Sequence, residues 1–234
     1  MTKKIAVVGA TGRMGKLALE LIKDSSDLEV FAALDSKSEL GEVLGADLIL
    51  DLTRLDVSES VVAFAQANSI PVVVGTSGWS KDKVAGLDSD GSAVVIIPNF
   101  SIGSMLATKF AAEAAKYFGS IEIVETHHAG KVDSPSGTAV RTAELISANR
   151  GEAKLIPGVG QEARGEVVAG VPIHSLRLEG VSAKQSVFLG GDSEVLTINH
   201  ETSSIAAYSA GILASIQFGL KSTGISVGLE SVLS

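Results

Sequence analysis

The segment of the chain richest in reactive side chains is residues 125–138, Glu-Thr-His-His-Ala-Gly-Lys-Val-Asp-Ser-Pro-Ser-Gly-Thr. His127 and His128 are two of only 4 histidines in the chain, and Lys131 follows shortly after them. A histidine or a lysine can give a proton to a substrate that is being reduced. Adjacent residues on a strand point to opposite faces, so these histidines are poorly placed to bind one metal ion together, and no cysteine is present to help. We therefore expect acid–base chemistry and no metal site.

The end of this segment is typical of a helix start that binds an anion. Ser134-Pro135 has the residue types of an N-cap followed by proline at the first helical position. Gly137 and Thr138 would then lie where backbone N–H groups have no partner inside the helix, and Lys131 would add a positive charge. A carboxylate or a phosphate is the expected ligand. The alternative, on residue types alone, is a capped helix that follows a strand with surface histidines.

A glycine-rich segment near the N-terminus is typical of dinucleotide binding. The predicted strand Lys4–Val8 leads directly into Gly-Ala-Thr-Gly-Arg-Met-Gly at residues 9–15. Glycines at these positions permit a tight turn, the approach of a pyrophosphate and close packing of strand and helix. Asp35 ends the next predicted strand, where a carboxylate can accept hydrogen bonds from ribose hydroxyls. The expected cofactor-binding residues here are Gly9, Ala10, Thr11, Gly12, Arg13, Met14 and Asp35.

The cofactor itself is expected to be NADH, NADPH or both. A carboxylate at Asp35 favours NADH, whereas Lys37 and Arg13 could pair with the 2′-phosphate of NADPH. Asp35 has an alternative role, in which it only caps the loop that follows it. The preference between the two cofactors stays open at this point.

The histidine segment resembles the signature of the dihydrodipicolinate reductase family, in which two adjacent histidines precede a lysine and a Ser/Ala-Pro-Ser-Gly-Thr turn. Further matches lie at residues 9–15, 75–78 (Gly-Thr-Ser-Gly), 98–101 (Pro-Asn-Phe-Ser) and 174–177 (His-Ser-Leu-Arg). The resemblance implies that His127 is the proton donor, Lys131 a second donor or charge partner and His128 a substrate contact. It also implies a carboxylate site at Gly137 and Thr138, and a nicotinamide site lined by Gly75, Thr76, Ser77, Pro98, Asn99 and Phe100.

The same resemblance implies an activity. It is the NAD(P)H-dependent reduction of 4-hydroxy-tetrahydrodipicolinate, a small cyclic dicarboxylate, to tetrahydrodipicolinate with loss of water, in lysine and diaminopimelate biosynthesis. A homotetramer formed through the sheet of a second domain is implied as well. Three departures from the family pattern stand in this chain: Ser77 for a second threonine, Leu-Thr-Arg-Leu at residues 52–55 for Phe-Thr-x-Pro, and Ile205 for an arginine.

Three other functions compete with this one. The chain could be another two-domain dehydrogenase of a small anionic substrate, a sensor that binds NAD(P)H without chemistry, or a homologue made inactive at Ile205. A sensor needs neither His127 nor Lys131, so their presence in one short segment favours an enzyme.

The elements that must position these residues follow from the apolar patterning. Short apolar runs alternate with helix-length amphipathic segments over the first hundred residues, which predicts a Rossmann-type, doubly wound parallel sheet. The predicted strands are 4–8, 29–34, 47–51, 71–74 and 93–97, and the predicted helices are 13–23, 57–68 and 80–87. The pattern then changes to that of a second, α+β domain. Its predicted helices are 103–118 and 135–148, and its first predicted strand is 121–127. Further strands are predicted over 173–199, and we expect them to pair antiparallel. A helix at 205–220 and a strand at 225–229 are expected to return to the first domain.

These elements predict two domains. Residues 1–100 with 206–234 form the expected dinucleotide-binding domain, and residues 101–205 the expected substrate-binding and oligomerisation domain. Residues 151–170 are expected to form a mobile loop.

The composition narrows the class of protein. With 45% hydrophobic and 20% charged residues, the 234-residue chain has enough apolar material for a folded core. A net charge of -8 opposes binding to nucleic acid or to an anionic membrane. The N-terminal apolar run is too short for a signal peptide or a membrane span, so we expect a cytoplasmic protein.

Overall fold

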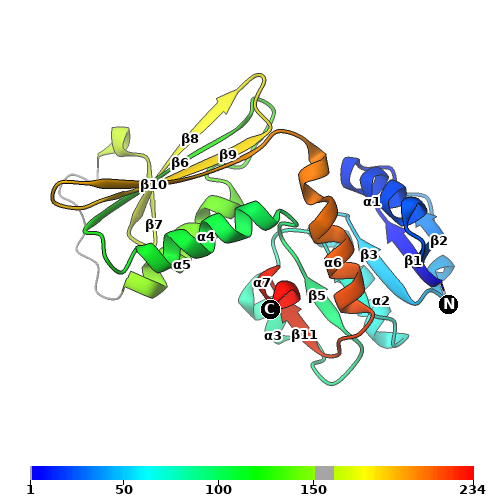
Figure 1. Ribbon diagram of the computed structural model, residues 1–234. Helices are drawn as coiled ribbons and strands as arrows, with labels where there is room; N and C mark the ends of the chain where they lie inside the picture. The colour runs from blue at the N-terminus through cyan, green and yellow to red at the C-terminus, as the bar shows by residue number, and fades with distance from the viewer. Residues whose placement is uncertain (1, 151–160) are drawn as a thin grey trace. The chain divides into compact units, whose positions relative to one another are not determined.

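The computed structural model describes residues 2–150 and 161–234. The chain divides into two compact units, Met1–Ile102 with Ile205–Ser234 and Gly103–Ser204. Figure 1 shows the helices and strands of both. The expected loop at 151–170 lies partly outside the described residues. The rest of it is more ordered than expected, because it contains the short helix η2 (Glu162–Arg164) and the strand β7 (Glu166–Val168).

The first unit is built on a six-stranded sheet with the order β11-β5-β4-β3-β1-β2. All its neighbouring strands pair in parallel. Its strands are β1 (Lys3–Val8), β2 (Leu28–Leu34), β3 (Leu48–Asp51), β4 (Val72–Val74), β5 (Val94–Ile96) and β11 (Ile225–Val227). The strand order reverses beside β1, and ligands of such sheets bind at the carboxyl ends of the strands near the reversal. The predicted parallel sheet is confirmed.

Helices cover both faces of this sheet. The unit contains α1 (Arg13–Asp24), η1 (Leu40–Val43), α2 (Leu55–Ala67), α3 (Lys81–Ala85), η3 (Ile205–Tyr208), α6 (Ser209–Gly219) and α7 (Glu230–Leu233). On one face, Val61 and Val62 of α2 join a core with Ile49 and Val74 of the strands. On the other face, α6 lies so close that a Cβ atom at Gly219 would stand 2.8 Å from the Leu48 side chain.

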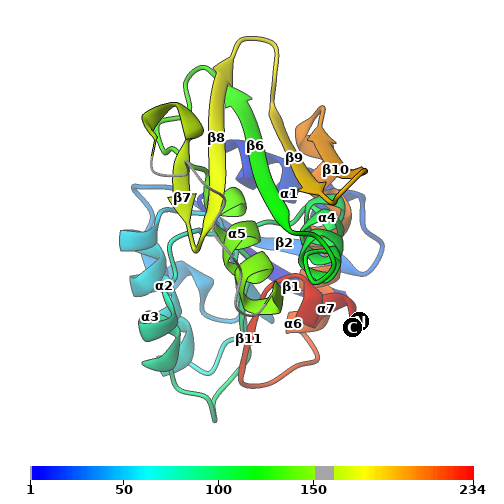
Figure 2. The same ribbon diagram turned by 90° about the vertical axis from the view of Figure 1, so that its left-hand side faces the viewer.

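The described part of the second unit is a five-stranded mixed sheet, with the order β10-β9-β6-β8-β7, together with two α-helices and the short helix η2. Its further elements are α4 (Ile102–Ala114), β6 (Ser120–His128), α5 (Gly137–Arg150), β8 (Val171–Leu178), β9 (Ala183–Gly190) and β10 (Val195–Thr202). Small side chains of α4 and α5 pack on Ile121, Ile123 and Ile173 of the sheet. Figure 1 shows the two helices along one face, and Figure 2 shows the strands side by side. We call the helix-covered face the inner face.

The expected antiparallel pairing over residues 173–199 is only partly correct. Strands β9 and β10 do pair antiparallel, but β8 pairs with β6 in parallel, and β6 lies between β8 and β9. The turn at Glu179-Gly180 therefore passes over the end of β6 instead of closing a hairpin. Alternation of apolar residues fixes which face of a strand is buried, but it does not identify the neighbouring strand.

Among the described residues, no helix has both the length and the apolar character needed to cross a membrane.

Candidate active site

A buried carboxylate on β6 is the centre of the candidate active site. Glu125 and His127 both point to the inner face, because they are two positions apart on one strand. The Glu125 side chain is fully buried, and its Oε2 atom lies 2.5 Å from Nδ1 of His127. A buried carboxylate requires partners for both oxygens. The neighbouring strand β8 supplies the main one.

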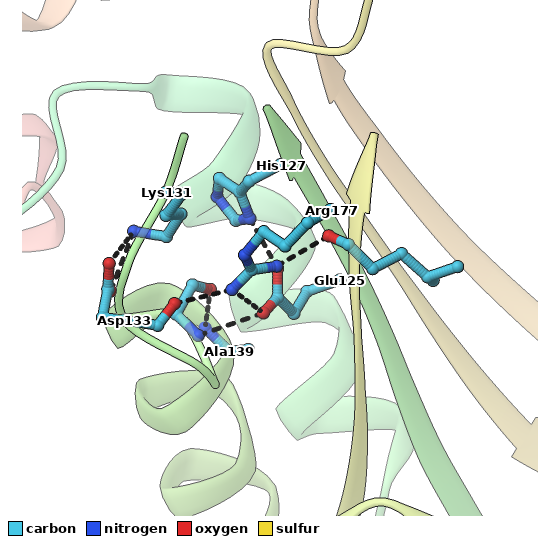
Figure 3. Close-up of polar contacts among 8 residues, drawn as sticks. Glu125, His127, Lys131, Asp133, Ala139 and Arg177 are labelled. Carbon is cyan, nitrogen blue, oxygen red and sulfur yellow. Dashed lines mark hydrogen bonds and ion pairs between the residues drawn. The ribbon is translucent and has the colours of Figure 1, made fainter. Parts of the chain in front are cut away.

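Arg177 of β8 is the charge partner of Glu125. The register pairs Arg177 with His127 across the two parallel strands, so both side chains leave the same face. Arg177 Nη2 donates to Glu125 Oε1 at 2.9 Å, and Nη1 donates to Oε2 at 3.0 Å. Such a two-point contact between guanidinium and carboxylate is strong and directional. Figure 3 shows Arg177 and His127 converging on Glu125.

The loop that follows β6 is attached to this pair. Arg177 Nη2 also donates to the backbone carbonyl of Asp133 at 2.6 Å, and the backbone N–H of Ser136 donates to Glu125 Oε1 at 3.2 Å. Within the loop, Lys131 Nζ lies 2.7 and 2.8 Å from the carboxylate oxygens of Asp133. Lys131 is therefore held beside the buried cluster (Figure 3).

The electrostatics of the cluster leave Glu125 ionised and His127 mostly neutral near pH 7. Burial tends to raise the pKa of Glu125, but the hydrogen bonds from Arg177 and the contact with His127 outweigh it and hold this pKa below its usual value. The pKa of His127 is lowered, first by burial and then by the positive charges of Lys131 and Arg177, against the opposing pull of Glu125. A histidine with a lowered pKa is a stronger acid once it is protonated.

The helix start after the histidine segment differs from the expectation. Helix α5 begins at Gly137, and Ser136 rather than Ser134 is the cap, because Ser136 Oγ accepts a hydrogen bond from the backbone N–H of Ala139 at 3.3 Å. Pro135 precedes the helix and follows a cis peptide bond. Gly137 has open space where a Cβ atom would stand, so a ligand can approach its backbone. Thr138 follows in the first turn.

His128 ends β6 and is exposed, unlike His127. Its ring lies beside Gly130, since a Cβ atom at Gly130 would stand 3.5 Å from His128 Nδ1. The structure thus places His128 with the loop that carries Lys131 and not with Glu125. Among residues 2–150 and 161–234, no group of three or more histidine and acidic side chains is arranged to hold a metal ion.

The glycine-rich turn has the close approaches that such a turn needs. A Cβ atom at Gly15 would stand 2.2 Å from the carbonyl oxygen of Gly9, and one at Gly9 would stand 2.7 Å from that of Leu52. Gly9 also has a positive φ of 86°. Gly12 is the N-cap of α1 and makes no side-chain cap, so the helix N-terminus is left to backbone N–H groups. Thr11 and Arg13 are exposed beside this helix start, Met14 is half-buried and Ala10 is buried under the turn. A helix start of this kind suits a pyrophosphate.

Asp35 has the capping role that was the alternative for it. Its Oδ1 atom accepts hydrogen bonds from the backbone N–H of Lys37 at 2.8 Å and from Ser38 Oγ at 3.4 Å. Both bonds use the same oxygen. The carboxylate remains exposed beyond the end of β2, where a ribose can still reach it.

The residues predicted to line the nicotinamide differ in burial. Thr76 and Phe100 are buried, with exposed fractions of 4% and 2%, whereas Ser77 and Pro98 are exposed. The Thr76 hydroxyl donates to the backbone carbonyl of Thr53 at 3.1 Å, so this side chain ties two loops together. Phe100 packs against Gly75, where a Cβ atom would stand 2.6 Å from its ring. Asn99 Oδ1 accepts from the backbone N–H of Ser101 at 2.9 Å.

A second buried acid lies under these loops. Asp51 ends β3, is fully buried, and accepts hydrogen bonds from Thr53 Oγ1 at 2.6 Å, from Thr76 Oγ1 at 3.4 Å and from Ser58 Oγ. Burial raises its pKa, against the opposing effect of those hydrogen bonds. Trp79 Nε1 donates to Ser58 Oγ at 3.1 Å, which adds one more hydrogen bond to the cluster around Asp51.

No role was predicted from the sequence for Glu125, Arg177 or Asp51. Glu125 could have been identified from the sequence. Side chains alternate between the two faces of a strand, so residues 125 and 127 lie on the same face of β6. Arg177 could not be matched to Glu125 from the sequence, because that match depends on the parallel pairing of β6 with β8. Ile205, the departure from the family pattern, is the half-buried first residue of η3.

Comparisons with known proteins cover the whole chain. The family model described as dihydrodipicolinate reductase, N-terminus, matches residues 3–100, and the one described as dihydrodipicolinate reductase, C-terminus, matches residues 103–233. The chain is 50% identical over its full length to the 4-hydroxy-tetrahydrodipicolinate reductase of Clavibacter michiganensis subsp. michiganensis, covering 87% of that protein. It is 42% identical to the enzyme of the same name from Streptomyces griseus subsp. griseus, with 98% of this chain and 97% of that one covered.

Solved structures agree with these matches. The dipicolinate-bound dihydrodipicolinate reductase of Paenisporosarcina sp. TG-14 superposes with a TM-score of 0.81 at 29% identity, covering 99% of each chain. A myo-inositol dehydrogenase of Corynebacterium glutamicum has a TM-score of 0.59 at 15% identity over 100% of this chain and 93% of that one, which is a likeness of fold.

Proposed function

The chain belongs to the dihydrodipicolinate reductase family, and from this premise we propose that it reduces 4-hydroxy-tetrahydrodipicolinate to tetrahydrodipicolinate with NADH or NADPH. The observation that carries the proposal is that both halves of the family pattern are present in one chain, with His127 and Lys131 placed around a buried Glu125–Arg177 pair. The activity belongs to lysine and diaminopimelate biosynthesis. Because the family is one of reductases, a sensor that binds NAD(P)H without chemistry is no longer a competing function.

The catalytic roles follow from the inner-face cluster. NADH or NADPH supplies the hydride when it is bound. We assign to His127 the proton that the reduced substrate takes up, since its Nδ1 is committed to Glu125 and Nε2 is the remaining site for transfer. Lys131 supplies positive charge next to it and serves as a second donor.

The substrate is a small cyclic dicarboxylate, and its carboxylates need a site. We assign one of them to the start of α5, where Gly137 leaves its backbone open and Thr138 follows in the first turn. Backbone N–H groups at a helix N-terminus favour an anion. His128 is exposed beside the Lys131 loop and is proposed as a further contact of the substrate.

The cofactor site is assigned to the carboxyl ends of the parallel strands of the first unit. The pyrophosphate is expected at the turn Gly9–Gly15 and the adenosine ribose at Asp35. The nicotinamide is expected beside the loops of residues 75–77 and 98–100. The fit rests on the close backbone approaches at Gly9 and Gly15, which exclude side chains at both positions.

A homotetramer is the proposed assembly. The face of the second sheet opposite to α4 and α5 carries exposed apolar side chains, among them Leu176, Leu178 and Phe188, with exposed fractions of 41%, 48% and 38%. Such a face is typical of a surface that packs against another copy. Light scattering coupled to gel filtration measures the mass in solution, and a monomer at micromolar concentration would contradict the proposal.

The activity is tested by the loss of NADH or NADPH absorbance with enzymatically generated 4-hydroxy-tetrahydrodipicolinate. His127→Gln and Lys131→Ala are expected to lower kcat/KM by about 10²–10⁴-fold, the usual contribution of general acid catalysis. Lys109→Ala, at an exposed position of α4, is the matched control and is expected to behave as the native protein. Native protein that binds NADH without oxidising it in the presence of the substrate would contradict the proposed reaction.

A further inference from the structure

We propose that Glu125 is a positioning residue for the reaction, which holds His127 in the tautomer with the proton on Nδ1 and leaves Nε2 as the atom that exchanges a proton with the substrate. Arg177 is the counter-ion that keeps Glu125 ionised and in place. The inference rests on the proposed function, because it assigns the proton transfer to His127. It adds the buried Glu125–Arg177 pair to the residues on which that transfer depends.

The contacts of Glu125 determine the direction of its hydrogen bond with His127. Oε1 accepts hydrogen bonds from Arg177 Nη2 at 2.9 Å and from the backbone N–H of Ser136 at 3.2 Å, while Oε2 lies 3.0 Å from Arg177 Nη1 and 2.5 Å from His127 Nδ1. Arg177 and the backbone are fixed donors. An ionised carboxylate is only an acceptor, so His127 must supply the proton in its contact with Oε2.

The tautomer follows from that contact. A neutral imidazole has one N–H, and here it is required on Nδ1, so Nε2 carries the lone pair. When His127 takes up a second proton, that proton is on Nε2. Protonation and donation therefore occur at one defined atom of a ring whose orientation is fixed by Glu125. Histidine ligands and bases in other proteins are commonly oriented by a carboxylate through their second nitrogen.

The charges around His127 make Glu125 necessary for its acid form. The groups that face the ring are Glu125 on β6, Arg177 on β8, and Lys131 and Asp133 in the following loop. Lys131 and Arg177 both disfavour an imidazolium, and burial does the same. Glu125 is the anion in direct contact with the ring. Without it, the protonated form would face two cations in a largely buried position.

Arg177 links this pair to the loop that carries Lys131. Its Nη2 atom contacts both the Glu125 carboxylate and the Asp133 carbonyl, the latter at 2.6 Å. Asp133 in turn binds Lys131 through its side chain. The orientation of His127 and Lys131, the two proposed proton donors, thus depends on the Arg177 guanidinium. A lysine could not replace this residue, because an ammonium group lacks the planar fork of donors.

The direct test is nitrogen NMR of protein labelled with ¹⁵N-histidine, without ligand, at a pH where His127 is neutral. The 4 histidines are assigned by single histidine-to-glutamine variants. The expected spectrum places the His127 proton on Nδ1 in the native protein. In Glu125→Gln, whose amide can donate to Nδ1, the proton is expected to move to Nε2. A native His127 with its proton on Nε2 overturns the proposal and requires no variant.

The kinetic test is the pH profile of kcat/KM. The rate is expected to fall as pH rises and His127 loses its acid proton, and in Glu125→Gln this fall should begin at lower pH with at least about a tenfold loss near neutrality. Glu125→Asp keeps the charge and should recover part of the native profile. An unchanged profile in a folded Glu125→Gln protein contradicts the proposal.

Glu122→Gln is the matched control. Glu122 also lies on β6 and also contacts a histidine and an arginine, with His174 Nε2 2.7 Å from Oε2 and Arg164 on Oε1, but it projects from the opposite face. Its loss should leave the pH profile and the His127 tautomer as in the native protein. If the tautomer is as expected but no NADH or NADPH is oxidised, the proposed function fails while the structural assignment stands; if oxidation occurs with an Nε2-protonated His127, only the assignment fails.

Discussion

Arg177 and Glu125 form a two-point ion pair on the inner face of the second sheet, with the guanidinium nitrogens 2.9 and 3.0 Å from the carboxylate oxygens. The two residues are distant in the sequence and come together because β6 and β8 are parallel neighbours. Arg177 is 19% exposed at its side chain and Glu125 is not exposed at all, so the pair lies in a region of low polarity. Two consequences for stability follow from this burial.

The first prediction concerns the loss of one partner. Arg177→Met leaves the Glu125 carboxylate buried without its counter-ion, and breaking such a pair costs ~3–5 kcal/mol. Urea unfolding of the variant should show a free energy of unfolding lower by about this amount. Lys83→Met removes the partner of Glu59 in the first unit, where both side chains are more than two-fifths exposed, and should cost ~1 kcal/mol or less. Equal losses in the two variants would show that burial does not set the strength of the pair.

The second prediction is the pH dependence that Glu125 contributes. Its folded-state pKa lies below the unfolded value, so the native state binds fewer protons at this site and gains stability above the unfolded pKa. That stability should be lost as pH falls through the folded pKa. Urea unfolding between neutral and acidic pH measures it as the difference between the native protein and Glu125→Gln, which should shrink on acidification. A difference that is constant with pH would refute the assignment of an ionised Glu125.

The third prediction is that Asp51 contributes a pH dependence of stability with the opposite sign. Its folded-state pKa is raised by burial, against its hydrogen bonds, so the native state favours the protonated carboxyl. The contribution to stability is complete below the unfolded pKa and declines as pH rises through the folded pKa. Relative to Asp51→Asn, the native protein should therefore be most stable at acidic pH and lose its advantage towards neutrality. The measurement is the same pair of urea titrations, and an advantage that grows with pH would contradict the raised pKa.

The sequence predicts the first unit better than the second for a physical reason. In a parallel sheet of alternating strands and helices, each strand is a short apolar run between amphipathic segments, and the glycines at 9, 12 and 15 predict where the cofactor binds. In the second unit, the position of β6 between β8 and β9 depends on long-range pairing that local alternation does not encode. The predicted N-cap at Ser134, with the helix starting at Pro135, was wrong because Ser136 has the same capping chemistry two residues later.

In the candidate site too, residues that lie in one segment could be predicted, whereas those that depend on long-range strand pairing could not. His127, Lys131 and the turn at Gly137 stand in one segment and could be identified together, whereas Arg177 requires knowledge of the β6–β8 register. The family resemblance predicted Thr76 as a cofactor contact, and this stays a prediction; in the structure its buried hydroxyl donates to the Thr53 carbonyl. Burial of a polar side chain is a tertiary property, and the residue type alone does not reveal it.

A fourth prediction tests the nucleotide turn. Gly15→Ala places a Cβ atom 2.2 Å from the Gly9 carbonyl oxygen, a contact with backbone that cannot be relieved by a side-chain rotation. The turn must shift, at a cost of ~1–3 kcal/mol by analogy with overpacked cores, and NADH binding measured by fluorescence or calorimetry should weaken strongly. Gly41→Ala is the control within the same unit, because nothing lies within 4 Å of its Cβ position. Native affinity for NADH in Gly15→Ala would place the cofactor elsewhere.

The last prediction separates binding from folding at the proposed carboxylate site. Gly137 has nothing within 4 Å of its Cβ position, so Gly137→Ala introduces no clash, and alanine leaves the unfolded chain less conformational freedom than glycine does. The variant should therefore be as stable as the native protein or more so. The added methyl group would nevertheless stand where a carboxylate approaches the backbone N–H groups, so KM for the substrate should rise. Gly119→Ala, equally free of contacts in the same unit, should keep the native KM. Because neither protein is destabilised by a clash, a KM unchanged in Gly137→Ala would move the carboxylate away from the start of α5.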